Sequence, residues 1–265
     1  MLKFRKVHGA GNDFILIAGP AADRDWPGTA GTLCARRTGI GADGLVVSTR
    51  FSGDPPGYLV SCFNADGSEA TMCGNALRCA AFCAARDYGD TEMSMVMAGA
   101  EHRAVVCGSD VAVTAQAGPV MPRVVEIRWD GTSFEFDSVH TGTEHVVAFV
   151  ADVDEVDVEG CGRIVRYHRR VAPLGTNVNF VQIRGPAAVK VRTYERGVEA
   201  ETLSCGSGAV AAVAAARARH LIGDTPVTVH NKARAPLTVR LDAAAGGTGF
   251  WVSGPATVVC QGEIS

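Results

Sequence analysis

Two cysteines occupy matching positions in the chain and could act together as an acid and a base. Cys73 and Cys205 are each followed by a short glycine-containing turn and then by an alanine-rich run. Such runs favour helix, so each thiol is expected at a helix N-terminus, where unpaired backbone N–H groups and the helix dipole stabilise negative charge. A thiolate forms more readily there, and a carboxylate would bind there. One thiolate could therefore remove a proton from a carbon while the other thiol protonates its opposite face, which inverts a stereocentre.

The similarity of the two segments extends upstream of the cysteines. Glu69 stands four residues before Cys73, and Glu201 stands four residues before Cys205. Such a repeat is best explained by two halves of similar build. We therefore expect two helix ends, each with a thiol, that face one another across a cleft.

Further polar residues could assist the two thiols. His145 and Glu195 are candidates to relay protons to them or to set their ionisation, and Arg196 could clamp a second carboxylate because its planar fork matches that group. Asn12, in a turn that contains glycine, could bind an amino-acid head group through its amide. The structural alternatives are that His145 only packs beside a strand and that Glu195 only pairs with Arg196.

Composition narrows the class of protein. The chain has 265 residues, 47% hydrophobic and 20% charged, with a formal net charge of -3, which suggests neither nucleic acid nor an anionic membrane surface as a partner. No stretch resembles a transmembrane span or a signal peptide. Nine cysteines, an odd number, do not form the disulfide framework of a small secreted domain. We therefore expect a cytoplasmic protein whose other cysteines are core residues: Cys34, Cys62, Cys79, Cys83, Cys107, Cys161 and Cys260.

Neither a metal nor an organic cofactor is expected. Cys79 and Cys83 stand four residues apart on a predicted helix, but no second ligand pair accompanies them. A pyridoxal cofactor needs a Schiff-base lysine, and the four lysines all lie outside glycine-rich or phosphate-binding contexts.

The pattern of elements predicts an α+β fold of two similar halves. Short, mainly antiparallel strands recur between turns rich in glycine and proline, and each half has one principal alanine-rich helix. The run over 210–216 is apolar on every side, which is typical of a buried helix, so a sheet wrapped around a central helix is expected. We place the domains at 1–117 and 118–256, and a further helix is expected at 29–38.

Seven motifs together resemble the diaminopimelate epimerase family, the cofactor-independent enzymes of lysine and cell-wall biosynthesis. The resemblance runs through most of the chain. It rests on these segments: His8-Gly9-Ala10-Gly11-Asn12-Asp13-Phe14, Gly39-Ile40-Gly41-Ala42-Asp43-Gly44, Asn64-Ala65-Asp66-Gly67-Ser68-Glu69, Met72-Cys73-Gly74-Asn75, Asn177-Val178-Asn179-Phe180, Tyr194-Glu195-Arg196-Gly197 and Cys205-Gly206-Ser207-Gly208.

The resemblance implies a role for each matching residue. Cys73 and Cys205 would be the acid/base pair that interconverts LL- and meso-diaminopimelate, and His145 and Glu195 would support them. The backbone N–H groups of Gly74, Asn75, Gly206 and Ser207 would hold the reacting carboxylate. The remaining substrate contacts, to the amino groups and the distal carboxylate, would come from Asn12, Asn64, Asn177 and Arg196. The family fold is two pseudo-symmetric domains, with residues 257–265 returning to the first; closure over the substrate and a homodimer are also implied.

Three positions depart from the family's pattern, and other functions remain open. Glu144 stands where proline is usual, Ala76 where glycine is common, and Asn231 begins a stretch that often carries paired glycines. A proline or hydroxyproline racemase would also use two cysteines but usually carries histidine after Cys-Gly, and a phenazine-type isomerase would lack the cysteine pair. From other classes, the chain could be a thiol redox protein or a non-catalytic amino-acid-binding protein.

Overall fold

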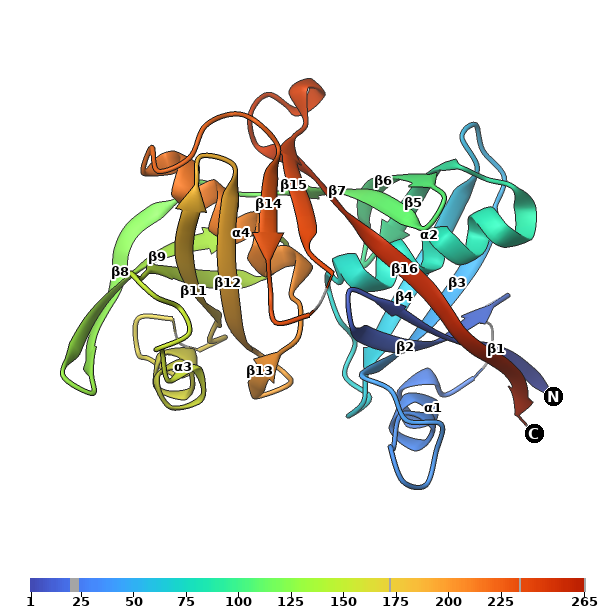
Figure 1. The fold of residues 1–265 in the computed structure, drawn as a ribbon. Helices are drawn as coiled ribbons and strands as arrows, with labels where there is room; N and C mark the ends of the chain where they lie inside the picture. The colour runs from blue at the N-terminus through green and yellow to red at the C-terminus, as the bar shows by residue number, and fades with distance from the viewer. Residues whose placement is uncertain (20–23, 172, 234, 265) are drawn as a thin grey trace. The chain divides into compact units, whose positions relative to one another are not determined.

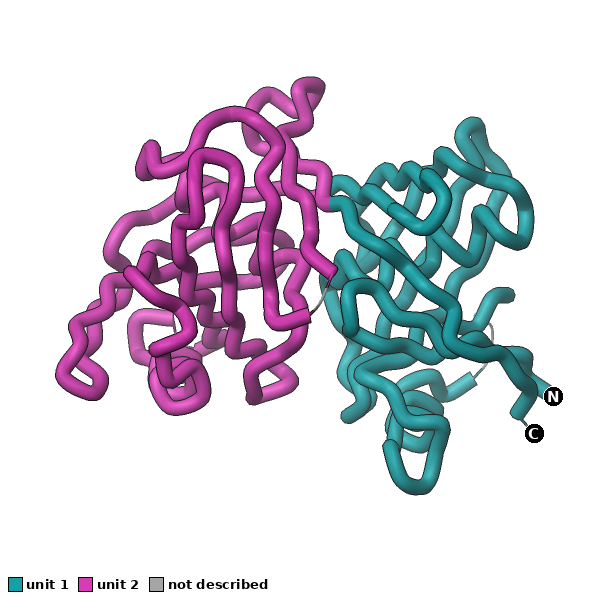
Figure 2. The backbone as a smooth tube through the Cα atoms, viewed as in Figure 1, with its two compact units in different colours: residues 1–114, 253–265 teal, residues 115–252 magenta. Residues whose placement is uncertain are grey.

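The chain forms two compact units in the computed structural model, which describes residues 1–19, 24–171, 173–233 and 235–264. Unit 1 consists of Met1–Thr114 and Ser253–Ser265, and unit 2 consists of Ala115–Val252 (Figure 2). Two strands, β7 (Asp110–Gln116) and β16 (Gly249–Ile264), run from one unit into the other. The predicted α+β fold of two halves, each with a central alanine-rich helix, is confirmed (Figure 1).

Unit 1 is a closed ring of strands around one helix (Figure 1). The strands follow the order β1 to β7 and then β16, which pairs with β1 and closes the ring. The other strands are β1 (Leu2–Gly9), β2 (Asn12–Ala18), β3 (Gly44–Phe51), β4 (Gly57–Asn64), β5 (Glu92–Met97) and β6 (Ala100–Cys107). The helices are α1 (Trp26–Leu33) and α2 (Gly74–Tyr88).

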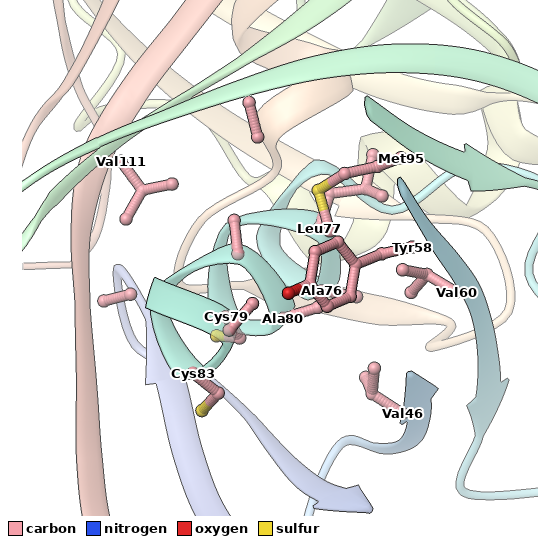
Figure 3. Packing of buried hydrophobic residues seen from close by; sticks show 14 of the residues in the cluster. Val46, Tyr58, Val60, Ala76, Leu77, Cys79, Ala80, Cys83, Met95 and Val111 are labelled. Atoms are coloured by element: carbon pink, nitrogen blue, oxygen red, sulfur yellow. The ribbon is translucent and has the colours of Figure 1, made fainter. Parts of the chain in front are cut away.

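Small side chains let helix α2 lie inside this ring. Ala76, Cys79 and Ala80 are at most 1% exposed, and residues of β3, β4, β5 and β7 surround them (Figure 3). Alanine and cysteine side chains are short, so strands can approach the helix axis closely on several sides. This packing fixes the N-terminus of α2, and with it the position of Cys73.

Unit 2 likewise has a sheet that packs around one central helix. Its strand order is β16, β15, β14, β12, β11, β10, β9, β8, and β13 pairs with β12. The strands are β8 (Met121–Trp129), β9 (Thr132–His140), β10 (Glu144–Phe149), β11 (Asn177–Gly185), β12 (Ala188–Glu195), β13 (Ala200–Thr202), β14 (Val227–His230) and β15 (Leu237–Leu241). The helices are α3 (Val158–Arg166), α4 (Gly206–Ala218) and the 3-10 turn η1 (Ala243–Ala245).

Helix α4 is the buried centre of unit 2. Every residue from Gly206 to Ala216 is buried, and the helix contacts β9, β10, β11, β12 and β15. A helix that is apolar on all sides gains by removing every face from water, whereas an amphipathic helix needs to bury only one. The sheet of unit 2 therefore holds the N-terminus of α4, and with it Cys205.

The helices connect parallel strands, which explains the similar position of the two thiols. Parallel pairs cannot be joined by a tight turn and need a crossover. In unit 1, α1 connects β2 to β3 and α2 connects β4 to β5; in unit 2, α3 connects β10 to β11 and α4 lies between β12 and β14. Each thiol thus stands where the chain leaves a sheet and begins the second crossover helix of its unit.

Some details differ from the expectations. Helix α1 begins at Trp26 instead of residue 29, because Asp25 caps it with a bond from the Gly28 backbone N–H. Helix α3 begins at Val158, where Asp157 caps it with a bond from the Gly160 backbone N–H. Cys107 and Cys260 are exposed and therefore not core residues, because Cys107 faces outward at the end of β6 and Cys260 lies in the second half of β16, where no described residue is buried.

No helix in the part of the chain that the structure describes is long and apolar enough to cross a membrane.

Candidate active site

Both cysteines are the N-cap residues of the central helices. Cys73 (φ −145°, ψ 97°) and Cys205 (φ −118°, ψ 112°) have the extended backbone typical of that position. Their carbonyl groups accept the first helical bonds, from Leu77 and Ala209, each at 3.0 Å. The N–H groups of the first helical turn have no partner within the helix, so each sulfur stands beside donors that favour an anion. The predicted placement of Cys73 and Cys205 at helix N-termini agrees with the structure.

In unit 1, the structure brings Asn12 and Asn75 together through a chain of hydrogen bonds. Asn75 Nδ2 donates to Asn12 Oδ1 at 3.1 Å, and Asn12 Nδ2 donates to Asp43 Oδ2 at 2.8 Å. At the other end, Arg78 Nη2 donates to Asn75 Oδ1 at 2.5 Å. A guanidinium can only donate and a carboxylate can only accept. Arg78 and Asp43 therefore fix which way both amide groups point.

Asn64 is held beside this chain in a turn. It ends β4 opposite Gly44, the residue after Asp43, and its Nδ2 donates to Ser68 Oγ at 2.9 Å. Its backbone N–H also bonds to the Ser68 carbonyl, at 2.8 Å. The turn therefore fixes the Asn64 amide at the same end of β3 and β4 as Asp43.

Two sulfur atoms contact Cys73 from neighbouring strands. Met97 Sδ of β5 accepts from the Cys73 backbone N–H at 3.3 Å, and Cys62 of β4 makes a side-chain hydrogen bond with Cys73. That bond, together with burial, raises the pKa of Cys62 well above its ordinary value. Cys62 therefore stays protonated and can donate its S–H to the Cys73 sulfur.

In unit 2, a row of hydrogen bonds leads from Cys205 into the core. The Cys205 Sγ lies 3.4 Å from Ser207 Oγ and accepts from the Gly208 backbone N–H at 3.4 Å. Ser207 Oγ lies 3.0 Å from His145 Nε2, and His145 Nδ1 lies 3.1 Å from Asn179 Nδ2. His145 thus reaches Cys205 only through a hydroxyl group.

The partners of Asn179 determine the state of His145. Asn179 Oδ1 accepts from Thr193 Oγ1 at 3.0 Å, so its Nδ2 is the donor toward His145 Nδ1. The imidazole hydrogen then lies on Nε2 and is donated to Ser207, whose own hydrogen can be donated to Cys205. Burial, and next the charge of Arg196, lowers the pKa of His145 to about 3. His145 is therefore a neutral donor at physiological pH and does not take up a proton itself.

Asn177, Glu195 and Arg196 lie together at the ends of β11 and β12. Asn177 Oδ1 accepts from the Arg196 backbone N–H at 2.9 Å, and its Nδ2 donates to the Glu144 carbonyl at 2.9 Å. The Arg196 guanidinium donates to Thr143 Oγ1 at 2.7 Å, while Glu195 accepts from Thr202 Oγ1 at 2.8 Å. The Arg196 side chain is thus directed toward the loop before β10 that leads to His145.

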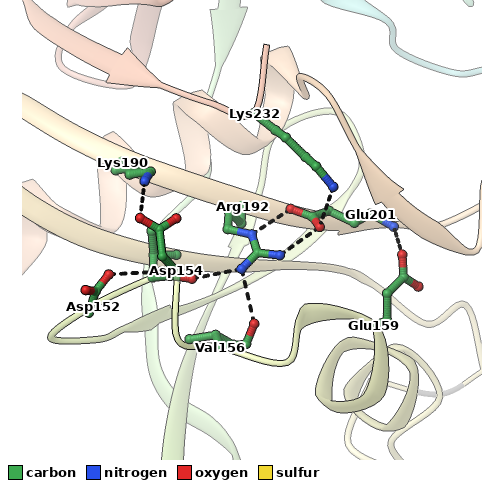
Figure 4. Close-up of polar contacts among 9 residues, drawn as sticks. Asp152, Asp154, Val156, Glu159, Lys190, Arg192, Glu201 and Lys232 are labelled. Atoms are coloured by element: carbon green, nitrogen blue, oxygen red, sulfur yellow. Dashed lines mark hydrogen bonds and ion pairs between the residues drawn. The ribbon is translucent and has the colours of Figure 1, made fainter. Parts of the chain in front are cut away.

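The glutamates at matching positions before the cysteines have the same backbone role and different side-chain roles. Glu69 bridges Phe63 and Glu201 pairs with Tyr194, so each joins the following segment to the preceding strand. Glu69 is exposed, whereas the side chain of Glu201 is 4% exposed and forms ion pairs with Arg192 at 2.7 Å and Lys232 at 2.9 Å (Figure 4). The Glu201 ion pairs hold β13, four residues before Cys205.

The three departures from the family pattern have structural roles. Ala76 is fully buried in α2, Glu144 pairs with His140 at 2.9 Å, and Asn231 donates to Ser204 Oγ at 3.0 Å. Asn231 thereby supports the residue immediately before Cys205. None of the three adds a charged group to the hydrogen bonds described for Cys205 and His145.

Sequence reasoning missed Asp43, Arg78 and Asn179. Asn179 could have been found, because it stands two residues after Asn177 in an apolar strand and so shares its face. Asp43 lies inside a recognised motif and Arg78 stands three residues after one, but only the fold shows what they contact. In the described ranges, no group of three His, Cys, Asp or Glu side chains is arranged to hold a metal ion.

Comparison with known proteins identifies the family of the chain. The family model for diaminopimelate epimerase matches residues 4–128 and 138–242. A diaminopimelate epimerase from Methanothrix thermoacetophila is 39% identical, over 100% of this chain and 96% of its own length. One from Aquifex aeolicus is 34% identical, over 100% of this chain and 98% of its own length. The chain belongs to the diaminopimelate epimerase family.

More distant solved structures share the fold of this diaminopimelate epimerase family member. A hydroxyproline epimerase from Agrobacterium vitis matches 99% of this chain and 90% of its own with a TM-score of 0.71 at 15% identity. A phenazine biosynthesis protein of the PhzF family from Bacillus anthracis matches 100% of this chain and 99% of its own with a TM-score of 0.73 at 12% identity. At these identities the likeness concerns the fold alone, so the racemase alternative is supported only as a relative.

Proposed function

We propose that this protein is a diaminopimelate epimerase that interconverts LL- and meso-2,6-diaminopimelate, a step of lysine and peptidoglycan biosynthesis. The observation that carries the proposal is the pair of thiols, Cys73 and Cys205, each at the N-terminus of the buried central helix of its unit. Full-length relatives named diaminopimelate epimerase, at 32–39% identity, support the substrate. We further propose that the enzyme acts in the cytoplasm, as a homodimer, on this small molecule alone.

The proposed reaction moves one proton off the α carbon and another onto its opposite face. The thiolate of one cysteine takes the α proton, and the electron pair left on carbon spreads into the adjacent carboxylate. The thiol of the other cysteine then donates its proton to the same carbon from the other side. The two sulfurs thereby exchange protonation states, so the enzyme is left ready for the opposite stereoisomer or must first exchange protons with water.

Helix N-termini would stabilise the charge that grows on the carboxylate. The backbone N–H groups of Gly74 and Asn75 in α2, and of Gly206 and Ser207 in α4, belong to first helical turns that favour an anion. A donor fixed in advance stabilises developing charge without a reorganisation cost during the reaction. These four groups are the proposed site for the reacting carboxylate.

The remaining substrate contacts are assigned to side chains that the structure holds in place. Asn12 and Asn64 in unit 1, and Asn177, Glu195 and Arg196 in unit 2, are proposed to bind the amino groups and the distal carboxylate. Asn12, Asn177 and Arg196 have hydrogen-bond partners that orient them. Arg196 is the residue proposed to pair with the distal carboxylate, because a guanidinium binds that group with two parallel bonds.

The deciding experiment is stereoinversion by single-cysteine variants. Cys73→Ala and Cys205→Ala should each abolish the conversion of LL- to meso-diaminopimelate while circular dichroism shows a retained fold. Cys161→Ala removes a buried thiol of α3 outside the proposed site and should keep activity, which makes it the matched control. Full activity in either variant of the pair would refute the two-thiol mechanism.

Substrate and solvent exchange separate the alternatives. Turnover of diaminopimelate should exceed that of proline, glutamate and histidine, and the product formed in deuterium oxide should carry deuterium at the α carbon. Preference for proline would indicate a related racemase. Binding without exchange would indicate an amino-acid-binding protein, and reversible thiol oxidation without stereoinversion would indicate a redox protein.

A further inference from the structure

Arg78 is a fully buried cation without a carboxylate partner. Its relative exposure is 0%, and its single hydrogen bond among the described residues is to Asn75 Oδ1. Its Nε and Nη1 atoms have no hydrogen-bond acceptor within the described ranges. A guanidinium stays charged inside proteins, and a buried charge without a counterion is unfavourable. Such a group calls for an explanation, because nearly all buried polar groups find a partner.

The guanidinium lies against the first turn of helix α2. Its Nη1 is 4.0 Å from the point where a Cβ on Gly74 would stand, and its Nη2 is 3.5 Å from the same point on Gly9. The N-terminus of a helix is already a centre of positive potential. The positive charge of Arg78 and the positive end of the helix thus lie at the same place, and both would stabilise an anion there.

Among the groups that face Arg78 and Cys73, one that is at least partly buried can supply the anion. Arg78 interacts electrostatically with Cys79 and Cys73 of the same helix region and with Asp110 of β7. Burial raises the pKa of the Cys79 thiol far above neutrality, and Cys62, which faces Cys73 from β4, is also held protonated. Asp110 is exposed to solvent, which screens its charge, and within the described ranges it accepts no hydrogen bond from the guanidinium. The sulfur of Cys73 is therefore the neighbour that can carry the matching charge.

Unit 2 has no such cation at the equivalent position. Aligning Cys73 with Cys205 places Arg78 opposite Val210, a buried apolar residue of α4. There the sulfur is approached instead by the hydroxyl of Ser207, backed by neutral His145. The two thiols thus differ in electrostatic environment, although their helices begin alike.

We propose that Arg78 is a positioning residue whose buried charge stabilises the thiolate of Cys73 and whose bond to Asn75 fixes the amide chain to Asn12. This rests on the proposed function only in giving Cys73 a catalytic role; the charge effect itself is independent of turnover. It follows that Cys73, which has a thiol and a thioether as neighbours, ionises more readily with the Arg78 charge than it would without it.

The test is the pH dependence of alkylation of each cysteine by iodoacetamide, followed by peptide mass spectrometry. Three variants separate charge from hydrogen bonding: Arg78→Lys keeps both, Arg78→Gln keeps a donor without charge, and Arg78→Met removes both. In the Arg78→Gln and Arg78→Met variants, the pH at which Cys73 reaches half of its maximal alkylation rate should rise by one unit or more. Alkylation of Cys73 at pH 7 should then be slower by about tenfold. The Arg78→Lys variant should keep most of the wild-type rate of Cys73 alkylation.

Cys205 in the same molecules is the internal control, and its alkylation profile should not change. If the pH dependence of Cys73 alkylation is the same in Arg78→Lys and Arg78→Gln, the charge of Arg78 has no effect on Cys73. Arg78 would then act only through its hydrogen bond to Asn75. Equal slowing at Cys205 would also overturn the charge role, because the effect would then be general. The Lys and Gln pair decides the question even where Arg78→Met does not fold. Absence of diaminopimelate turnover in the wild type would contradict the proposed function and leave the alkylation result standing.

Discussion

Acidification should destabilise this protein through His145, a histidine buried without charge. Burial lowers its pKa from 6.5 to about 3 in the folded chain, so the folded state does not bind a proton between these values whereas the unfolded state does. Stability therefore depends on pH in this window: it is complete above 6.5 and falls as the pH falls toward 3. No other titration of this imidazole in the folded protein is expected near neutral pH.

The size of the effect follows from the two pKa values. At pH 5 the pH lies 1.5 units below the pKa of the imidazole in the unfolded chain. Protonation therefore stabilises the unfolded state by about 2 kcal/mol. Near pH 3 the loss approaches its limit of about 5 kcal/mol, the energy equivalent of the whole shift. A loss of about 2 kcal/mol is a large part of the stability of an ordinary domain.

Urea unfolding at pH 7 and pH 5 measures this directly. The free energy of unfolding should fall between the two pH values by about 2 kcal/mol more in the wild type than in His145→Gln, which has no titrating group at this position. His140→Gln is the matched control, because that imidazole lies on the surface and bonds to Glu144. The free energy of unfolding that His140→Gln loses between pH 7 and pH 5 should not be smaller than the wild-type loss, whereas that of His145→Gln should be. An equal loss in wild type and His145→Gln would refute a neutral, buried His145.

Two further substitutions test the geometry around the second thiol. Ser207→Ala removes the hydroxyl 3.4 Å from the Cys205 sulfur, and because hydrogen bonds to charged groups are strong, turnover should fall by about 10- to 100-fold. The melting temperature should also fall, because buried His145 loses its hydrogen-bond acceptor. Unchanged turnover would show that the hydroxyl does not act on the sulfur. Gly208→Ala would place a Cβ 2.5 Å from Asn179 Oδ1 and 3.3 Å from the Cys205 sulfur, so steady-state kinetics should show a clear loss of kcat. Gly223→Ala, where a Cβ would meet nothing within 4 Å, should behave as wild type, and equal kinetics for the two alanine variants would contradict the close packing.

Much of the site could be predicted because its main signals are local. A cysteine, a glycine-containing turn and an alanine-rich run lie within a dozen residues, and local propensity is enough to place the thiol at the start of a helix. The repeat of that pattern indicates two similar halves. Helix boundaries were less certain, as α1 shows, because a cap depends on one side-chain contact such as that of Asp25.

The outward position of Cys107 and Cys260 shows where such reasoning fails. Apolar neighbours in the sequence suggested burial, but burial in a strand depends on which face points inward. Cys107 ends β6 opposite Asp110, next to the hairpin, and Cys260 lies toward the outer end of β16. Both outcomes depend on where the strands end and pair in the folded sheet, which apolar neighbours in the sequence do not show.

The sequence by itself determined the two thiols, the helices that begin beside them and the family to which the motifs belong, since each of these depends on residues that are neighbours in the chain. Only the tertiary structure decided the partners. The Asn75–Asn12 and Ser207–His145 bonds join residues more than 60 positions apart, and the burial of Arg78 needs a closed ring of strands. Contacts of that kind depend on sheet register and packing in three dimensions, which no local pattern encodes.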